Sequence, residues 1–261
     1  MSLIGIIASA SAPPPTSPVA GYKAWYDASD TATITVSGSA VTQWNDKSAN
    51  AYNLTQSTAA NRPASGTRTL NSLNVIDFDG ADMLENATQS NWTFLSNSGG
   101  SSVFFVAISD TNTTFASIIN TIDELSSSRR GLNIGRTGDT FKIPISVRNN
   151  NSGNGAILSN DQGDMTAGTA IYYTALLTPN NATTADRAIS RVNGGAEIKN
   201  NTLTQAPSAS APEVGLRIGD YQLAGALGLN GAIGEILLYE GVVSATDRAK
   251  NESYLKNKWG L

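Results

Sequence analysis

Short apolar runs recur along the chain from Gly21 onward, and each run is bounded by glycine, asparagine, aspartate or serine. Runs of this length between turn residues are typical of β-strands, and their number predicts two packed antiparallel sheets. We therefore expect an all-β fold, a two-sheet antiparallel β-sandwich. The predicted strands are residues 22–27, 40–44, 73–78, 102–109, 115–120, 131–135, 140–147, 170–177, 187–192, 196–199, 213–219 and 232–240.

One short helix is predicted, and it closes the chain. Ser244 precedes the helical segment and Asp247 follows three residues later, which is the spacing of a capping box. Lysines near the C-terminal end suit the negative end of the helix dipole. The helix has few apolar residues, so we expect the ring of Trp259 to be buried on the sandwich and to hold the helix in place.

Residues 1–20 differ in composition from residues 21–261, and we expect them to form an extended N-terminal arm before a single β-domain. Apolar residues at its start would anchor the arm to a partner, and prolines stiffen the path that follows. A linker, a frayed terminus and an atypical signal peptide are the alternatives, although no basic residue precedes the apolar run. The predicted anchoring residues are Leu3, Ile4, Ile6, Ile7, Pro13, Pro14 and Pro15.

Charge and residue content exclude several function classes. The formal net charge is −4 and no basic run is longer than Arg129-Arg130, so we expect no nucleic-acid partner. The chain has no histidine and no cysteine, which excludes imidazole bases, imidazole or thiolate metal sites and disulfides. No apolar run is long enough for a membrane span. Any catalysis would have to use carboxylates, lysine, tyrosine or serine.

Asp77, Asp79 and Asp82 lie together in one short segment. Asp77 and Asp79 are two residues apart and would share a strand face, as the paired carboxyl groups of a glycoside hydrolase require. Their glycine-containing context indicates a turn instead, and we expect no enzymatic activity. Carboxylate oxygens also bind Ca²⁺, the one cofactor that the sequence suggests, and these three residues are its candidate ligands. Surface acids that serve a turn are the alternative.

Two aromatic residues in polar surroundings are candidates for carbohydrate binding by stacking on a sugar ring. Trp92 lies in a polar stretch after a turn, and Tyr221 lies in a loop before the last long strand. A place in the hydrophobic core is the alternative for both residues. The polar insertion at residues 149–168 is either a binding loop on a rigid sandwich or a solvated excursion.

Motifs near the two ends of the chain occur in a characteristic order. Residues 22–56 contain W-x-D and W-N-D-K-S, and residues 61–66 read N-R-P-A-S-G. Residues 74–84 contain F-D-G, and residues 229–261 contain I-G-E-x-L-x-Y and end on W-G-L. This set resembles the concanavalin-A-like, laminin-G-like jelly-roll domains of bacteriophage and bacterial surface proteins. The resemblance implies two curved antiparallel sheets and motif residues that serve mainly the architecture, and it implies little about activity.

These features together favour a non-enzymatic structural protein of a bacteriophage virion, either a capsid decoration protein or a tail- or fibre-associated protein. Residues 1–20 would bind other virion proteins, the chain would form a homo-oligomer, and the lectin-like domain would attach to cell-surface glycans of the host. A secreted, extracellular carbohydrate-binding module of a bacterium is the first alternative. A glycoside hydrolase is the second.

Overall fold

The computed structural model describes residues 15–111, 115–123, 126, 129–136, 141–148, 157–159, 161–199, 211–220 and 227–261. Its strands are β1 (Ala24–Asp27), β2 (Ile34–Ser37), β3 (Ala40–Trp44), β4 (Leu54–Thr55), β5 (Ala64–Leu70), β6 (Leu73–Asp79), β7 (Leu84–Asn86), β8 (Ser101–Ser109), β9 (Ala116–Asn120), β10 (Gly131–Arg136), β11 (Ile145–Arg148), β12 (Ile157–Ser159), β13 (Ile171–Leu177), β14 (Ala188–Val192), β15 (Leu216–Ile218) and β16 (Asn230–Glu240). The described helices are α1 (Ala245–Trp259) and the short 3-10 helices η1 (Thr31–Thr33), η2 (Ala59–Asn61), η3 (Gln89–Leu95) and η4 (Thr184–Asp186).

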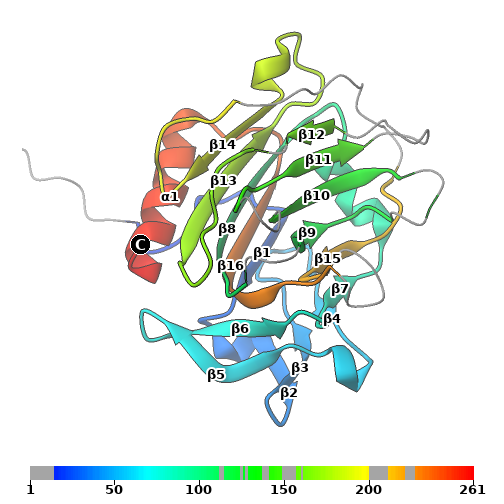
Figure 1. Ribbon diagram of the computed structural model, residues 1–261, viewed down its shortest axis with the longest axis vertical. Coiled ribbons are helices and arrows are strands. Elements are labelled where there is room, and N and C mark those ends of the chain that lie inside the picture. Colours follow the sequence, from blue (N-terminus) through cyan, green and yellow to red (C-terminus); the bar gives the residue numbers. More distant parts are fainter. Residues whose placement is uncertain are drawn as a thin grey trace, which may run out of the picture.

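The strands form an all-β antiparallel fold with a short C-terminal helix, as the sequence predicts. Hydrogen bonding is continuous in the order β12-β11-β10-β9-β15-β7-β4-β3-β5-β6-β16-β8-β13-β14, with β1 paired to β16 and β2 paired to β3. This sheet curls around a core that takes side chains from β8, β13 and β16 as well as from β9, β10 and β11 (Figure 1). The prediction of two separate sheets is corrected here, because the pairing through β7, β4, β3, β5 and β6 makes one nearly closed, barrel-like sheet.

β8 shows why the longest apolar runs are continuous and not alternating. Val103, Phe105 and Ala107 point into the central core, whereas Phe104 and Val106 belong to a second apolar cluster beneath α1. Successive residues of a strand point to opposite faces, so a strand that is covered on both faces is apolar throughout. The neighbouring strands β13 and β16 have the same property, and α1 covers this part of the sheet (Figure 1).

α1 begins and ends as the sequence predicts. The Ser244 Oγ accepts a hydrogen bond from the backbone N–H of Asp247, and Gly260 ends the helix in the left-handed conformation with φ of 71°. The ring of Trp259 is fully buried. An added Cβ at Gly234 of β16 would lie 2.9 Å from that ring, so the close approach of helix and strand requires glycine there. The predicted role of the tryptophan is confirmed.

The sequence pattern misses β2, β4, β5, β7 and β12. β4, β5 and β7 carry few apolar residues, β2 is mostly exposed, and β12 lies within the predicted polar insertion at residues 149–168. β5, for example, reads A-S-G-T-R-T-L and has no buried residue. Three predicted strands are much shorter than expected, and the first of these, the run at 213–219, contains β15 (Leu216–Ile218). The run at 140–147 contains β11 from Ile145 onward, and the run at 196–199 contributes an isolated bridge between Ile198 and Ser190.

The first residues that the structure describes pack against α1 and β16. Pro18 is buried, the Val19 N–H donates to Asn251 Oδ1 at 2.8 Å, and the Tyr239 hydroxyl donates to the Val19 carbonyl at 2.6 Å. Of the predicted anchoring residues, Pro15 is half-buried at the start of this segment. The others, Leu3, Ile4, Ile6, Ile7, Pro13 and Pro14, lie outside the described residues. No helix in the described part of the chain has the length and apolar character of a membrane span.

Candidate functional site

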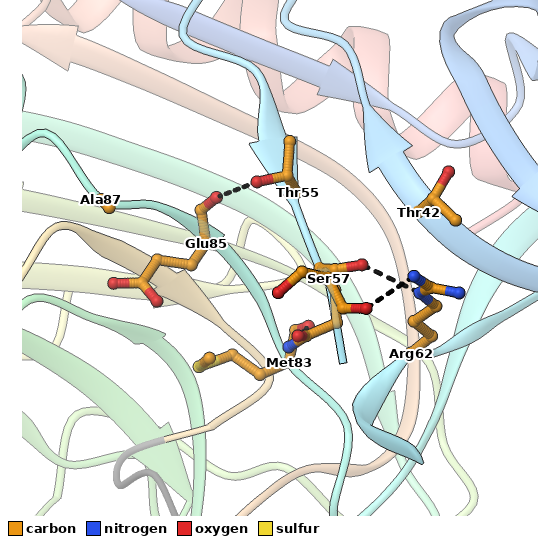
Figure 2. Close-up of a pocket in the computed structure, with 8 residues that line it drawn as sticks. Thr42, Thr55, Ser57, Arg62, Met83, Glu85 and Ala87 are labelled. Atoms are coloured by element: carbon orange, nitrogen blue, oxygen red, sulfur yellow. Dashed lines mark hydrogen bonds between the residues drawn. The ribbon is translucent and has the colours of Figure 1, made fainter. Parts of the chain in front are cut away.

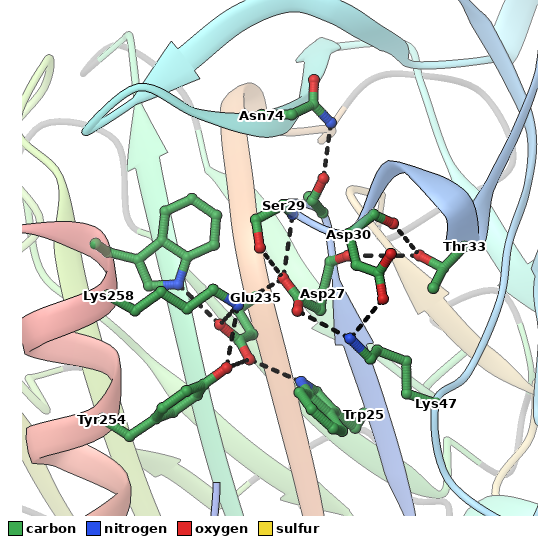
Figure 3. Close-up of polar contacts among 12 residues, drawn as sticks. Trp25, Asp27, Ser29, Asp30, Thr33, Lys47, Asn74, Glu235, Tyr254 and Lys258 are labelled. Atoms are coloured by element: carbon green, nitrogen blue, oxygen red, sulfur yellow. Dashed lines mark hydrogen bonds and ion pairs between the residues drawn. The ribbon is translucent and has the colours of Figure 1, made fainter. Parts of the chain in front are cut away.

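The sequence motifs from the two ends of the chain meet in one buried polar cluster. β1 pairs with β16 so that Asp27 lies opposite Glu235, and Lys258 of α1 contacts both carboxylates (Figure 3). We call this cluster the clasp. Its members are Trp25, Asp27, Lys47, Glu235, Tyr254, Lys258 and Trp259.

Glu235 is the centre of the clasp. Its side chain is fully buried, and its two carboxylate oxygens accept four hydrogen bonds. Trp25 Nε1 and the Tyr254 hydroxyl each donate to Oε1 at 2.7 Å. Lys258 Nζ and Trp259 Nε1 each donate to Oε2 at 2.8 Å. Burial raises the pKa of Glu235, although the charge of Lys258 opposes that shift.

Asp27 shares Lys258 with Glu235. The Lys258 Nζ lies 2.6 Å from Asp27 Oδ1, and the Lys47 Nζ lies 3.2 Å from Asp27 Oδ2. Burial disfavours the charged form of Asp27, but the lysine charges and a hydrogen bond from Ser29 outweigh it and hold the pKa of Asp27 below its usual value. The clasp therefore keeps both of its carboxylates paired with a cation.

Asp46 fixes the loop that carries Lys47. Its Oδ1 accepts hydrogen bonds from the backbone N–H groups of Trp25 and Ser48, at 2.9 and 2.8 Å. Its Oδ2 accepts a hydrogen bond from the Tyr52 N–H at 2.9 Å. The W-N-D-K-S motif is thus a polar turn that a carboxylate holds together.

The clasp has the properties of a structural element. The polar groups of Glu235 are saturated by donors of the chain itself, and no clasp residue lines either of the pockets that follow. The clasp residues tie β1, β16 and α1 together, and the candidate binding site lies elsewhere.

A polar pocket of about 360 Å³ opens among β3, β4 and β7, and Figure 2 shows its side chains. We call it the Arg62 pocket. Its lining residues are Thr42, Thr55, Gln56, Ser57, Arg62, Met83, Glu85 and Ala87. Six of these eight carry a polar side chain, so the pocket presents mainly hydrogen-bonding groups.

The Arg62 guanidinium is held by the loop that follows β4. Its Nε donates to the Gln56 carbonyl at 2.9 Å and its Nη2 donates to the Ser57 carbonyl at 2.7 Å (Figure 2). A guanidinium group has five N–H donors. These two hydrogen bonds fix the orientation of the group and leave most of its donors for a ligand.

Hydroxyl and carboxylate groups stand around this guanidinium. The Thr55 hydroxyl makes only a long hydrogen bond, 3.4 Å, to the Glu85 carbonyl, and Ser57 is exposed. The Glu85 carboxylate is partly exposed and lies 3.6 Å from Arg217 Nε. Donors and acceptors with spare capacity thus converge on one concave surface, which is the chemistry that the hydroxyl groups of a sugar require.

A second pocket, of about 320 Å³, adjoins the F-D-G turn, and we call it the Asp82 pocket. Its lining residues are Arg62, Ala64, Asp77, Phe78, Asp79, Asp82, Asp110 and Asn230. Gly80 of this turn has a φ of 96°, in the region that favours glycine. The Asp82 Oδ2 accepts a hydrogen bond from the Asp79 N–H at 2.9 Å. Burial, together with the negative charge of Asp79, raises the pKa of Asp82 to about 6.

The three aspartates proposed as calcium ligands have different partners. Asp77 Oδ1 lies 3.1 Å from Arg68 Nη1, Asp79 is exposed, and Asp82 is buried with 5% of its surface accessible. Among the described residues, no group of three or more acidic side chains is placed to hold a metal ion. The predicted set is therefore divided between an ion pair, an exposed carboxylate and a buried carboxyl group.

The two aromatic candidates for sugar stacking have different outcomes. Trp92 in η3 is fully buried, its ring packs edge-on against Tyr52 at 5.3 Å, and its Nε1 donates to Asn86 Oδ1 at 3.2 Å. It is a core residue and has no exposed face for a sugar in this structure. Tyr221 lies outside the described residues.

The residues of the Arg62 pocket were missed in the sequence because they come from separate segments without a common pattern. Thr42 and Thr55 lie on β3 and β4, and Glu85 lies on β7. Five of the eight lie within segments of the resemblance, namely Thr42, Thr55 and Gln56 (residues 22–56), Arg62 (61–66) and Met83 (74–84). Of these, Arg62 alone belongs to one of its named motifs, N-R-P-A-S-G.

No protein-family model and no curated protein sequence matches the chain. Solved structures are similar in fold. Domain 4 of AbnA, a GH43 extracellular arabinanase from Geobacillus stearothermophilus in complex with arabinotriose, matches with a TM-score of 0.58 at 10% identity, over 90% of this chain and 98% of that chain. Trypanosoma rangeli sialidase in complex with the inhibitor DANA matches with a TM-score of 0.56 at 13% identity, over 92% of this chain and 34% of that chain.

An arabinofuranosidase complexed with arabinofuranosyl-alpha-1,2-xylobiose is also similar, with a TM-score of 0.56 at 14% identity. The match covers 83% of this chain and 50% of that chain. The chain thus spans nearly all of the arabinanase domain, and half or less of the arabinofuranosidase and the sialidase. At these identities the likeness shows the fold.

These neighbours correct the predicted function. The sequence favoured a non-enzymatic structural protein of a bacteriophage virion, whereas the similar structures belong to glycoside hydrolases. They overturn the expectation of a non-enzymatic virion protein. The prediction failed because the motifs that suggested it report architecture, and this architecture serves many activities.

Proposed function

We propose that the chain is a carbohydrate-active β-domain that binds a glycan in the Arg62 pocket. The convergence of unsaturated polar groups around a fixed guanidinium carries the proposal. The likeness to the arabinanase domain supports it, because that domain was solved with arabinotriose and nearly its whole length is matched. We also propose that the curled sheet is a concanavalin-A-like fold.

The geometry suits sugars better than apolar ligands. Two carbonyl groups hold Arg62 in place before any ligand arrives, so little conformational entropy is lost when its remaining donors are engaged. Thr55 and Glu85 supply a hydroxyl group and a carboxylate within the same pocket. Apolar surface is limited to Met83 and Ala87, which leaves room for the carbon face of one sugar ring.

A glycan array tests this proposal with two matched variants. Thr55→Val replaces a hydroxyl group of the pocket by a methyl group of similar size and keeps a β-branched residue in β4. Thr35→Val makes the same change on β2, where Thr35 is exposed and lines neither pocket. We expect the wild type and the Thr35 variant to bind the same glycans, and the Thr55 variant to bind them about tenfold more weakly. Absence of binding by the wild type, or equal binding by all three proteins, contradicts the proposal.

Hydrolysis of a glycan at the Asp82 pocket is a second candidate function, and the environment of Asp82 favours it. A general acid is most effective when its pKa lies near the working pH, and a pKa of about 6 keeps the proton where an ordinary aspartate has lost it. Release of reducing sugar from the glycans that the array selects tests this function. Loss of release in Asp82→Asn supports it, and unchanged release excludes Asp82 as the acid.

A further inference from the structure

The Arg62 pocket and the Asp82 pocket share one wall. Arg62 lines both pockets, and the neighbouring residues Asp82 and Met83 line one pocket each. The Met83 N–H donates to the Asn61 carbonyl at 3.0 Å, so the segment before β7 is joined to the segment that carries Arg62. The two cavities therefore adjoin at Arg62, and a backbone hydrogen bond joins the two segments that border them.

The charges of the Asp82 pocket limit what can occupy it. Arg68 is engaged by Asp77 and by Asp110, whose two carboxylate oxygens lie 2.6 and 2.8 Å from its guanidinium nitrogens. This ion pair leaves the exposed carboxylate of Asp79 as an acceptor without a cation that the structure describes. Asn230 adds an amide group that can both donate and accept. Hydroxyl groups fit this surface. An anionic group would meet one cation of the lining, Arg62, against four aspartates, and the excess of negative charge disfavours it.

We propose that the two pockets form one groove for an uncharged oligosaccharide of at least two sugar units, with Arg62 at the junction. This inference rests on the proposed function, since it assigns the class of glycan to the same site. The Arg62 pocket takes the first sugar, and the Asp82 pocket takes the next one through hydrogen bonds from its hydroxyl groups to Asp79. A monosaccharide occupies one of the two pockets and therefore binds more weakly than an oligosaccharide. Sialylated or uronic-acid glycans bring a negative charge close to the Asp79 carboxylate and also bind more weakly.

An array of neutral and acidic glycans of increasing length, followed by calorimetry, tests the groove. We expect neutral oligosaccharides to bind about tenfold more tightly than the matching monosaccharide, and acidic glycans to bind more weakly than their neutral counterparts. Asp79→Asn keeps the acceptor for the Ala81 N–H and so preserves the turn. It should weaken the binding of oligosaccharides, leave monosaccharide binding unchanged and reduce the discrimination against acidic glycans.

Thr55→Val is the complementary variant, because it should weaken the binding of monosaccharides and of oligosaccharides alike. Equal affinity for monosaccharides and longer glycans, or a preference for acidic glycans, overturns the groove and leaves glycan binding intact. Equal effects of the two variants on every glycan also overturn it. If no glycan binds the wild type, the proposed function itself fails, and the groove fails with it.

Discussion

The clasp and the Arg62 pocket are both built from polar side chains, and they differ in how much hydrogen-bonding capacity they leave free. In the clasp, Glu235 is buried and receives four donors from the chain itself. In the pocket, Arg62 uses two hydrogen bonds to hold its own orientation and keeps other donors available. A saturated polar cluster stabilises a fold, whereas an oriented and unsaturated one can bind a ligand.

The largest effect is expected in the clasp. Lys258→Met removes the cation that Asp27 and Glu235 share, and an uncompensated buried charge costs about 3–5 kcal/mol of unfolding free energy. Lys256→Met, on an exposed position of the same helix, should change the unfolding free energy by less than about 0.5 kcal/mol. Urea denaturation measures both. Equal stability of the two variants would show that the clasp is not the structural element described here.

The next largest effect concerns Asp82 and depends on pH. Its pKa is about 6 in the folded protein against the ordinary 3.8 of an aspartate, so the folded state holds the proton more tightly than the unfolded state. The stability from this group is complete below pH 3.8 and is lost as the pH rises through 6. Asp82→Asn should therefore gain about 2–3 kcal/mol relative to the wild type between acidic and neutral pH. Urea denaturation across that range measures the gain, and a pH-independent difference would contradict it.

A smaller effect on stability, with a clear effect on binding, is expected from Arg62→Lys. The charge is retained, but the fixed fork of donors is lost, and we expect glycan affinity to fall about tenfold or more. Arg187→Lys is a close control, because Arg187 Nε also donates to a carbonyl six residues earlier, that of Asn181, and lines neither pocket. Both variants should lose about 1 kcal/mol of stability. Calorimetry should show a lower glycan affinity for the Arg62 variant than for the Arg187 variant. Equal glycan affinities of the two variants would show that Arg62 is not part of the binding site.

The smallest effect is expected at an exposed ion pair. Lys23 Nζ lies 2.7 Å from Glu240, with the two side chains 38% and 52% exposed. An exposed pair contributes about 0–1 kcal/mol, so Lys23→Ala should barely change the denaturation midpoint. A loss as large as that of Lys258→Met would mean that burial does not distinguish the two pairs.

The sequence predicts the buried strands and the helix well, because their signals are local. The continuous apolar run of β8 and the cap at Ser244 follow from neighbouring residues alone. The clasp depends on Asp27 and Lys258, which are 231 residues apart, so its composition follows only from the register of β1 on β16 and the position of α1. The family motifs indicated these residues and not their contacts.

The binding site is predicted poorly, for a physical reason. Trp92 was a candidate because its neighbours in the sequence are polar, yet η3 turns its ring into the core. The pocket residues lie on short polar strands such as β4 and β7, which have no apolar period for the sequence to reveal. Surface chemistry of this kind appears only when the fold brings the segments together.

Amide chemical-shift mapping by NMR tests the central claim most directly, with the wild-type protein titrated with the neutral oligosaccharide that the glycan array ranks first. The largest shifts should fall on residues 55–57, on Arg62 and on residues 82–85, while the amides around Glu235 and Trp259 stay unchanged. Shifts centred on the clasp, or on strands far from β4 and β7, would contradict the assignment of the glycan to the Arg62 pocket.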